Sequence, residues 1–363
     1  TLTNTQHVPV GTRVEVENLL GHITVKQGGP TFSVTATVVA GGKNQQAAQA
    51  LADLVGIRVR HDHDGMVIHV HYPTDQYTSY QYVLPKGAEA NKHAIHFLGM
   101  TFHGSSSISS MKYQRTHVTV YQGHDKGVPL HVDLVVSMPV DSHAKIDNRV
   151  GAIKAADLKG SLSLENDSGD ITASRVSGQL QIDVDSGDTL ASDITGPLKI
   201  ESDSGDVTVK AVNGTTTVKA DSGDIRATRL DGDQLELDSD SGDIVVSGAS
   251  GTLHADADSG DVRIDGLGTV PYLKAKSDSG DIHVSGNLAG VASFKLASDS
   301  GDVTLTSSQP PAVHLDISAT DIRVNWPGVR NMQSRDGHYS ADIGAATGQG
   351  RISTDSGDVT LTR

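Results

Sequence analysis

One short acidic motif, Asp-Ser-Gly-Asp, occurs nine times, starting at Asp167, Asp185, Asp203, Asp221, Asp240, Asp258, Asp278, Asp299 and Asp355. Carboxylate oxygens are the ligands that hard cations such as Ca²⁺ prefer. Stacked motifs would align their first and last aspartates in two columns. The candidate calcium ligands are therefore Asp167, Asp170, Asp185, Asp188, Asp203, Asp206, Asp221 and Asp224.

The same carboxylates also suit a purely structural role. Like charges on neighbouring strands about 4.8 Å apart repel by roughly 1 kcal/mol per pair in water, so something must offset the repulsion. An Asp side chain that accepts backbone N–H bonds across its own corner would do so. The sequence also lacks the glycine-rich nonapeptide of calcium-binding β-rolls. We therefore favour the structural role and expect no cofactor, with bound Ca²⁺ as the alternative.

Histidine is concentrated in the first part of the chain, where 13 of the 17 histidines precede residue 151. The pairs His61 and His63, and His69 and His71, are spaced i, i+2, which places each pair on one face of a strand. Two imidazoles on one face can begin a zinc or copper site. A polar strand face opposite Ile68 and Val70 explains the second pair equally simply, and we favour that interpretation.

The motif starts are separated by 18, 18, 18, 19, 18, 20, 21 and 56 residues. A period near 18 is typical of a solenoid. Apolar residues alternate on both sides of each motif, as with Leu162 and Leu164 before the first motif and Ile171 and Ala173 after it. This alternation predicts short strands whose apolar faces point inward. A second corner glycine, such as Gly178, closes most units and predicts three segments of about six residues per coil.

Glycine is the part of the corner that the sequence keeps most strictly. Two weaker corners, 19–22 and 149–152, lose the aspartates and the serine but retain glycine. A positive φ or a close approach of two backbones would require this. The structural corner glycines are Gly169, Gly187, Gly205, Gly223, Gly242, Gly260, Gly280, Gly301 and Gly357.

These observations predict an all-β fold dominated by a parallel β-helix or β-solenoid. The 56-residue gap equals about three periods, with weak corners at 318–321 and 335–338, so we count about 12 contiguous coils over 146–363. Residues 1–145 are expected to form a mainly β capping domain. That domain would contain a lone coil at 14–25, a short helix at 43–55 and an irregular excursion at 74–115.

Composition narrows the function classes. The chain has 29 basic and 44 acidic residues and a net charge of −15, which disfavours nucleic acid and anionic membranes as partners. Because there is no cysteine, the fold uses neither disulfides nor thiolate–metal sites. No apolar run is long enough to cross a bilayer. A start at Thr1 instead of Met fits a chain whose signal peptide has been removed.

The chain resembles a known group at several of these motifs. "VENLLGHITV" at 16–25, "SMPVDSHAKIDNRVGAIKA" at 137–155 and the "SDSGDVTV"-type repeats are similar to the bacterial "putative adhesin" family, a β-strand-repeat group of unknown function related to the head-GIN type. The resemblance implies a β-solenoid outside the cytoplasm, in the periplasm, at the cell surface or secreted. It supplies no catalytic residues.

The sequence therefore favours a non-enzymatic structural, adhesive or self-assembly module. A calcium-binding solenoid is the second hypothesis and a polysaccharide-acting β-helix enzyme the third. A catalytic site would break the repeat with unique residues in a cleft, whereas these acids recur uniformly. A protein or surface glycan is the expected partner. The sequence shows no cap after the last motif, so that end is expected to be covered by residues 327–349 or to dock, as in a homo-oligomer.

Overall fold

The computed structural model describes residues 2–6, 12–61, 65–82, 95–97, 100–102, 107–122 and 126–363. Its contacts divide the chain into two compact units, an N-terminal unit, Thr1–Asp188, and a C-terminal unit, Thr189–Arg363. The sequence instead predicts a boundary between 145 and 146. The predicted boundary marks where the repeat begins, whereas the two units are defined by contacts between residues. The boundary between 145 and 146 therefore stays a prediction.

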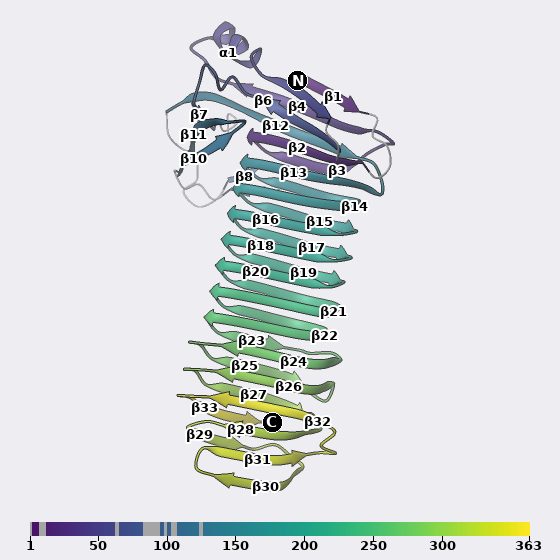
Figure 1. The fold of residues 1–363 in the computed structure, drawn as a ribbon, viewed down its shortest axis with the longest axis vertical. Coiled ribbons are helices and arrows are strands. Elements are labelled where there is room, and N and C mark those ends of the chain that lie inside the picture. Colours follow the sequence, from purple (N-terminus) through teal and green to yellow (C-terminus); the bar gives the residue numbers. More distant parts are fainter. Residues whose placement is uncertain are drawn as a thin grey trace. The chain divides into compact units, whose positions relative to one another are not determined.

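The N-terminal unit is β-rich, as Figure 1 shows, and the one helix among its described residues is α1 (Gln45–Ala52). Its strands are β1 (Leu2–Gln6), β2 (Arg13–Leu20), β3 (Ile23–Gln27), β4 (Phe32–Ala40), β5 (Gly56–His61), β6 (Gly65–His71), β7 (Ser79–Gln81), β8 (Ile95–Phe97), β9 (Met100–Phe102), β10 (Ser107–Tyr113), β11 (Thr116–Gln122), β12 (Val128–Met138), β13 (Ser142–Val150), β14 (Ile153–Ser168), β15 (Ile171–Ser177) and β16 (Leu180–Ser186).

The predicted lone coil at 14–25 is not isolated in space. Its strands β2 and β3 stack in parallel on β13 and β14, with Val16 opposite Ile146 and Ile23 opposite Ile153. The next coil follows at an offset of 18, with Ile146 opposite Leu164. The weak corners at 19–22 and 149–152 therefore occupy successive rungs of one ladder.

The rest of the N-terminal unit interrupts this ladder with antiparallel strands. β4 pairs antiparallel with β1 and β12, and β5 pairs antiparallel with β6. The helix predicted at 43–55 is present as α1, capped by the Asn44 side chain, which accepts the N–H of Ala47 at 2.8 Å. The segment expected to be irregular includes β10, which forms a hairpin with β11. Other parts of 74–115 lie outside the described residues.

The C-terminal unit consists of strands β17 to β33 (Figure 1). They are β17 (Thr189–Thr195), β18 (Leu198–Ser204), β19 (Val207–Asn213), β20 (Thr216–Ser222), β21 (Ile225–Ser241), β22 (Ile244–Ser259), β23 (Val262–Asp265), β24 (Val270–Ser277), β25 (Ile282–Asn287), β26 (Val291–Ser298), β27 (Val303–Gln309), β28 (Val313–Ser318), β29 (Asp321–Val324), β30 (Val329–Arg335), β31 (His338–Ile343), β32 (Gly348–Thr354) and β33 (Asp358–Thr362).

Each coil has two strand segments, not the three predicted from the spacing. The segment before an Asp-Ser-Gly-Asp corner pairs with the equivalent segment of the next coil, as β18 does with β20. The segment after the corner does the same, as β17 does with β19. Inward residues such as Val209 and Val218 are fully buried. Stacking therefore seals a narrow aliphatic core between two parallel ladders.

The order of the last coils in space differs from their order in the sequence. β32 pairs in parallel with β26 on one side and β28 on the other, while β33 pairs with β27 and β29. The coil that carries Asp355 thus lies between the Asp299 coil and the coil formed by β28 and β29. The 56-residue gap is therefore not three coils in series.

The two weak corners in that gap also have different outcomes. Residues 318–321 do connect the two strands of a coil, β28 and β29. Residues 335–338 are the turn of an antiparallel hairpin, β30–β31, and β31 pairs antiparallel with β28. The prediction of a coil at 335–338 was wrong, because these strands reverse direction. The hairpin within 327–349 covers the edge of β28. The end after the last motif, which was expected to be covered by this segment or to dock, is instead covered by β28 and β29.

Candidate functional site

The corner glycines are required by a close approach between rungs. A Cβ placed on Gly223 would lie 2.3 Å from the carbonyl oxygen of Gly205, and one on Gly242 would lie 2.1 Å from that of Gly223. Gly205 and Gly223 also have a positive φ, but Gly242 does not. The close approach of two backbones is thus the common reason for glycine at these corners. Within the N-terminal unit, a Cβ on Gly187 would likewise lie 2.4 Å from the carbonyl oxygen of Gly169.

The last aspartates of the corners form a hydrogen-bonded ladder. Seven of these carboxylates accept the backbone N–H of the equivalent Asp in the next rung, at 2.8–3.0 Å. In the N-terminal unit Asp170 accepts from Asp188, and in the C-terminal unit Asp206 accepts from Asp224 and Asp302 from Asp358. The carboxylates thus accept backbone N–H bonds from the neighbouring rung, whereas the sequence predicted bonds that close a turn within one corner.

Basic side chains bridge some of these carboxylates. Arg226 contacts Asp206 at 2.9 Å and Asp224 at 2.7 Å, so its guanidinium links two successive aspartates of the ladder. This arrangement offsets the repulsion between stacked charges with a cation from the chain itself.

The first aspartates of the corners lie at the surface. Asp185, Asp203 and Asp221 are exposed, and Asp167 is half-buried beside Arg149, whose Nη1 lies 2.9 Å from its carboxylate. Across the described residues no group of three or more His, Asp or Glu side chains is arranged to hold a metal ion. Calcium binding by the two columns stays a prediction.

A buried polar column directly before the first Asp was not anticipated from the sequence. In the N-terminal unit it consists of the buried amides of Asn18, Asn148 and Asn166. Asn148 Nδ2 donates to the carbonyls of Gly21 and Gly151 at 3.0 and 2.9 Å. The signal was present in the sequence as an acid–Asn pair that recurs in "VEN", "IDN" and "LEN", at 16–18, 146–148 and 164–166.

In the C-terminal unit small hydroxyl residues take over this column. Ser298 Oγ donates to the carbonyl of Gly280 at 2.9 Å and accepts the N–H of Gly301 at 2.8 Å. Thr354 contacts the Gly301 carbonyl at 2.8 Å in the same way. Buried corner groups that a strand ladder leaves unpaired thus find partners in side chains.

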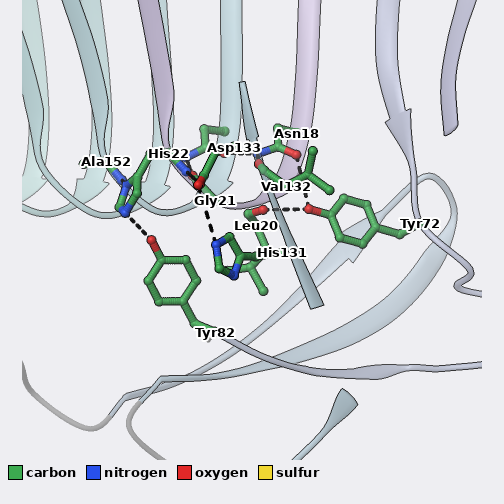
Figure 2. Close-up of polar contacts among 11 residues, drawn as sticks. Asn18, Leu20, Gly21, His22, Tyr72, Tyr82, His131, Val132, Asp133 and Ala152 are labelled. Atoms are coloured by element: carbon green, nitrogen blue, oxygen red, sulfur yellow. Dashed lines mark hydrogen bonds and ion pairs between the residues drawn. The ribbon is translucent and has the colours of Figure 1, made fainter. Parts of the chain in front are cut away.

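Figure 2 shows a cluster of histidine, tyrosine and aspartate in the N-terminal unit. The N–H of Ala152 donates to His22 Nδ1 at 3.2 Å, so the proton of the neutral ring lies on Nε2, which faces the hydroxyl of Tyr82. The backbone N–H of His22 donates to Asp133 Oδ1 at 2.9 Å. Both ring nitrogens are engaged, which leaves His22 without a free lone pair for base catalysis.

Electrostatics agrees with a structural role for this cluster. Burial lowers the pKa of His22 to about 4, so the ring is neutral at pH 7. Burial raises the pKa of Asp133, but the hydrogen bond and charge of His131 outweigh it and leave the pKa below its usual value. His131 lies against the Tyr82 ring at 4.9 Å between centroids. Within the described residues its buried Nδ1 has no hydrogen-bond partner.

The histidines predicted from i, i+2 spacing are not drawn together into one site. His61 is exposed at the end of β5, and His63 lies outside the described residues. His69 and His71 are partly buried on β6, and burial together with the charge of Arg58 lowers the pKa of both. The metal-ligand hypothesis for these four residues remains a prediction.

One pocket of the N-terminal unit is lined by charged residues that do not belong to the Asp-Ser-Gly-Asp repeat. It has a volume of about 380 Å³. Its floor is a row across three neighbouring strands, with Glu17 on β2 opposite His69 on β6 and Asp147 on β13. The β10–β11 hairpin forms a wall, fixed by the Tyr113 hydroxyl, which donates to the carbonyl of Val70 at 2.6 Å.

The charges in this pocket perturb one another. Asp147 is only 6% exposed, and burial raises its pKa to about 6 although Arg149 Nη2 lies 3.0 Å away. Burial and the charge of Glu15 raise the pKa of Glu17. Strongly shifted groups in a concave site indicate a functional location.

A second pocket, of about 580 Å³, lies in the C-terminal unit between the β30–β31 hairpin and the face formed by β26, β28 and β32. Lys295, Arg335 and Arg351 line it, and all three are exposed. The N-terminal pocket has exposed cations too, but this pocket has no buried carboxylate comparable with Asp147 among its described lining residues, so it is the weaker candidate for specific recognition.

The comparisons with known proteins bear mainly on the C-terminal unit. Its residues 189–362 match the family described as Toastrack DUF4097. These residues form a Toastrack domain. The match coincides with the C-terminal compact unit, so the Toastrack domain is the stretch of stacked β17 to β33 described above. It does not extend to the pocket of the N-terminal unit.

Two solved structures are similar to the chain at low identity. One is described as a "putative adhesin" from Bacteroides fragilis, at 10% identity over 99% of this chain and 95% of that chain, with a TM-score of 0.27. The other is described as a "putative cell adhesion protein" from Clostridium sporogenes, at 8% identity over 99% and 98%, with a TM-score of 0.14. TM-scores this low carry no argument about the Toastrack domain or its neighbour. No curated protein matches the chain.

Among the described residues, no helix is both long and apolar enough to span a membrane.

Proposed function

We propose that this chain is a non-enzymatic structural and adhesive module that acts outside the cytoplasm. The observation that carries the proposal is the aspartate ladder. Its carboxylates are engaged in the same way at successive rungs, by a backbone N–H of the next coil. Repetition of one structural bond is what a scaffold needs, whereas catalysis needs a unique group in a cleft.

Thermal unfolding with and without metal tests the role of the ladder. If the carboxylates are structural, 5 mM EDTA or 5 mM CaCl₂ leaves the Tm within about 1 °C of its value in buffer. A calcium-loaded column would instead be stabilised by mass action and lose several degrees on chelation. A large shift in Tm would therefore replace the scaffold by the calcium-binding solenoid as the leading function.

A second arm of the experiment addresses an enzyme that acts on polysaccharide. The chain is incubated with neutral and acidic polysaccharides and the release of reducing ends is measured. We expect none. Turnover that is lost in Glu17→Gln but retained in Asp243→Asn would place catalysis in the N-terminal pocket and overturn the non-enzymatic proposal, because Asp243 is an ordinary member of the ladder.

The proposed location follows from the family resemblance of the repeat motifs, which implies a periplasmic, surface or secreted chain. Partners there would be proteins or surface glycans. Because β31 covers the edge of β28, we expect the C-terminal unit not to assemble through that edge. Light scattering across a hundredfold concentration range should give a constant monomer mass, and a mass that rises with concentration would instead support assembly through a solenoid end.

A further inference from the structure

The N-terminal pocket differs in charge from the chain that carries it. The chain has a net charge of −15, yet four cationic side chains line the pocket, Arg60, Lys112, Arg115 and Arg149, against two carboxylates. Only Arg149 of these four forms an ion pair within the described residues, with Asp147 and Asp167. Three cations are therefore available to an anion from outside.

The two carboxylates restrict which anion the pocket accepts. Asp147 and the partly buried Glu17 lie side by side on paired strands. Carboxylates repel a second anionic group, so a compact dianion such as phosphate is disfavoured. The same oxygens accept hydrogen bonds from hydroxyl groups. The lining therefore suits a ligand with one carboxylate and several hydroxyls.

The pocket is also formed before any ligand arrives. Tyr113, at 3% exposure, anchors the hairpin wall to β6 by its hydroxyl, and Gln114 Nε2 donates to the same Val70 carbonyl at 3.2 Å. A volume of about 380 Å³ fits a monosaccharide and lies in the range of small-molecule sites. A preformed wall spares the ligand the entropy cost of ordering it.

We propose that this pocket binds an acidic sugar of the hexuronic acid class. Arg60 and Arg115 hold the ligand carboxylate, because guanidinium groups match carboxylates with paired N–H donors. Glu17 and Asp147 accept hydrogen bonds from the sugar hydroxyls. The proposal is independent of the scaffold function, since it concerns side chains that belong to no Asp-Ser-Gly-Asp corner.

Titration calorimetry on the full chain tests it with three probes: glucuronate, glucose and inorganic phosphate. Glucuronate should bind with a measurable Kd, and glucose and phosphate at least tenfold more weakly. Glucose that binds as tightly as glucuronate would overturn the role of the cations. Phosphate that binds as tightly would reduce the site to a general anion pocket and overturn the sugar assignment.

Two matched variants localise the binding. Arg60→Gln should weaken glucuronate binding at least tenfold. Arg58→Gln removes the same charge from the same strand, but Arg58 does not line the pocket, so its Kd should change less than threefold. Equal losses in both variants would reveal long-range attraction in place of a contact and overturn the proposal. Both arginines are exposed, and circular dichroism verifies that each variant is folded.

Discussion

The two compact units place different side chains directly before the corner. In the N-terminal unit the column before the corner has buried asparagines at three rungs and Val184 at the fourth, and one carboxylate, Asp147, is buried beside it. In the C-terminal unit the column consists of alanine, serine and threonine, and the corner carboxylates lie at or near the surface. The burial of a group that recurs at each rung must destabilise the fold very little. A charged group that occurs once can lower the stability and still be retained for function.

The same contrast separates the two pockets. Exposed cations line both pockets, but the pocket of the N-terminal unit also holds a buried acid, Asp147, and a fixed hairpin wall. The regular unit therefore suits a scaffold, and the irregular unit suits recognition. The following experiments test this division, in order of decreasing expected effect.

The largest effect is expected at a corner glycine of the regular unit. Gly223→Ala places a Cβ 2.3 Å from the Gly205 carbonyl oxygen at a φ of +128°, so it should lower the free energy of unfolding by roughly 3–4 kcal/mol. Trp326, the one tryptophan and a buried residue of this unit, reports its urea unfolding by fluorescence.

Gly29→Ala, in the N-terminal unit, is the control for an added Cβ in open space, because a Cβ there meets nothing within 4 Å, and circular dichroism follows its unfolding. It should change the stability by less than about 0.5 kcal/mol. A small loss at Gly223 would show that rungs can move apart, and the division between a rigid and an adaptable unit would then fail.

The buried acid of the irregular unit should make its stability depend on pH. The folded pKa of Asp147 is about 6, above the unfolded value near 4, so its favourable contribution is complete below about pH 4 and is lost as the pH rises through 6. The shift corresponds to about 3 kcal/mol. The carboxylates of Glu165 and Asp167 raise the pKa of Asp147 further. The cations of Arg149 and Lys145 lower it.

Asp147→Asn removes this dependence. The stability of the variant relative to the natural chain should therefore rise between pH 4 and 7, measured by hydrogen exchange of β13 amides. A difference that stays constant with pH would mean that the pKa of Asp147 is the same in the folded and unfolded chains, and the buried charge would no longer distinguish this unit.

A medium effect is expected in the hydroxyl column of the regular unit. Ser298→Ala leaves the Gly280 carbonyl and the Gly301 N–H without this side-chain partner, which should cost about 1–2 kcal/mol. Ser247→Ala, at an exposed position, is the control and should be neutral. Urea unfolding followed by Trp326 fluorescence measures both. Equal effects would show that the column contributes nothing specific.

The smallest effect, with the opposite sign, is expected at a left-handed position within the strands. Ala211 has a φ of 54°, and the equivalent positions two and three rungs on are Gly248 and Gly266. Ala211→Gly relieves the steric cost of that conformation and should stabilise the C-terminal unit by up to about 1 kcal/mol. Ala220→Gly, at a buried strand position, should destabilise it instead. If Ala211→Gly lowers the stability, the positive φ of Ala211 does not strain the folded chain.

Local features of the rung could be predicted from the sequence because each depends on a few neighbouring residues. Alternation such as Leu198 and Ile200 before a corner and Val207 and Val209 after it identifies two inward faces, and these residues are buried. The retained glycine identifies a place where backbones touch. The buried asparagines could also be predicted from the sequence, since the acid–Asn pair recurs three times.

The sequence alone could not decide which rung lies beside which, or where a strand reverses. The coil with Asp355 lies between two coils that precede it in the sequence, and Arg335–His338 turns a hairpin instead of a solenoid corner. Parallel ladders with the same alternation can pair in any order, so local pattern leaves the choice open. The pocket formed by Glu17, Asp147 and the β10–β11 hairpin likewise exists only after distant segments have packed together.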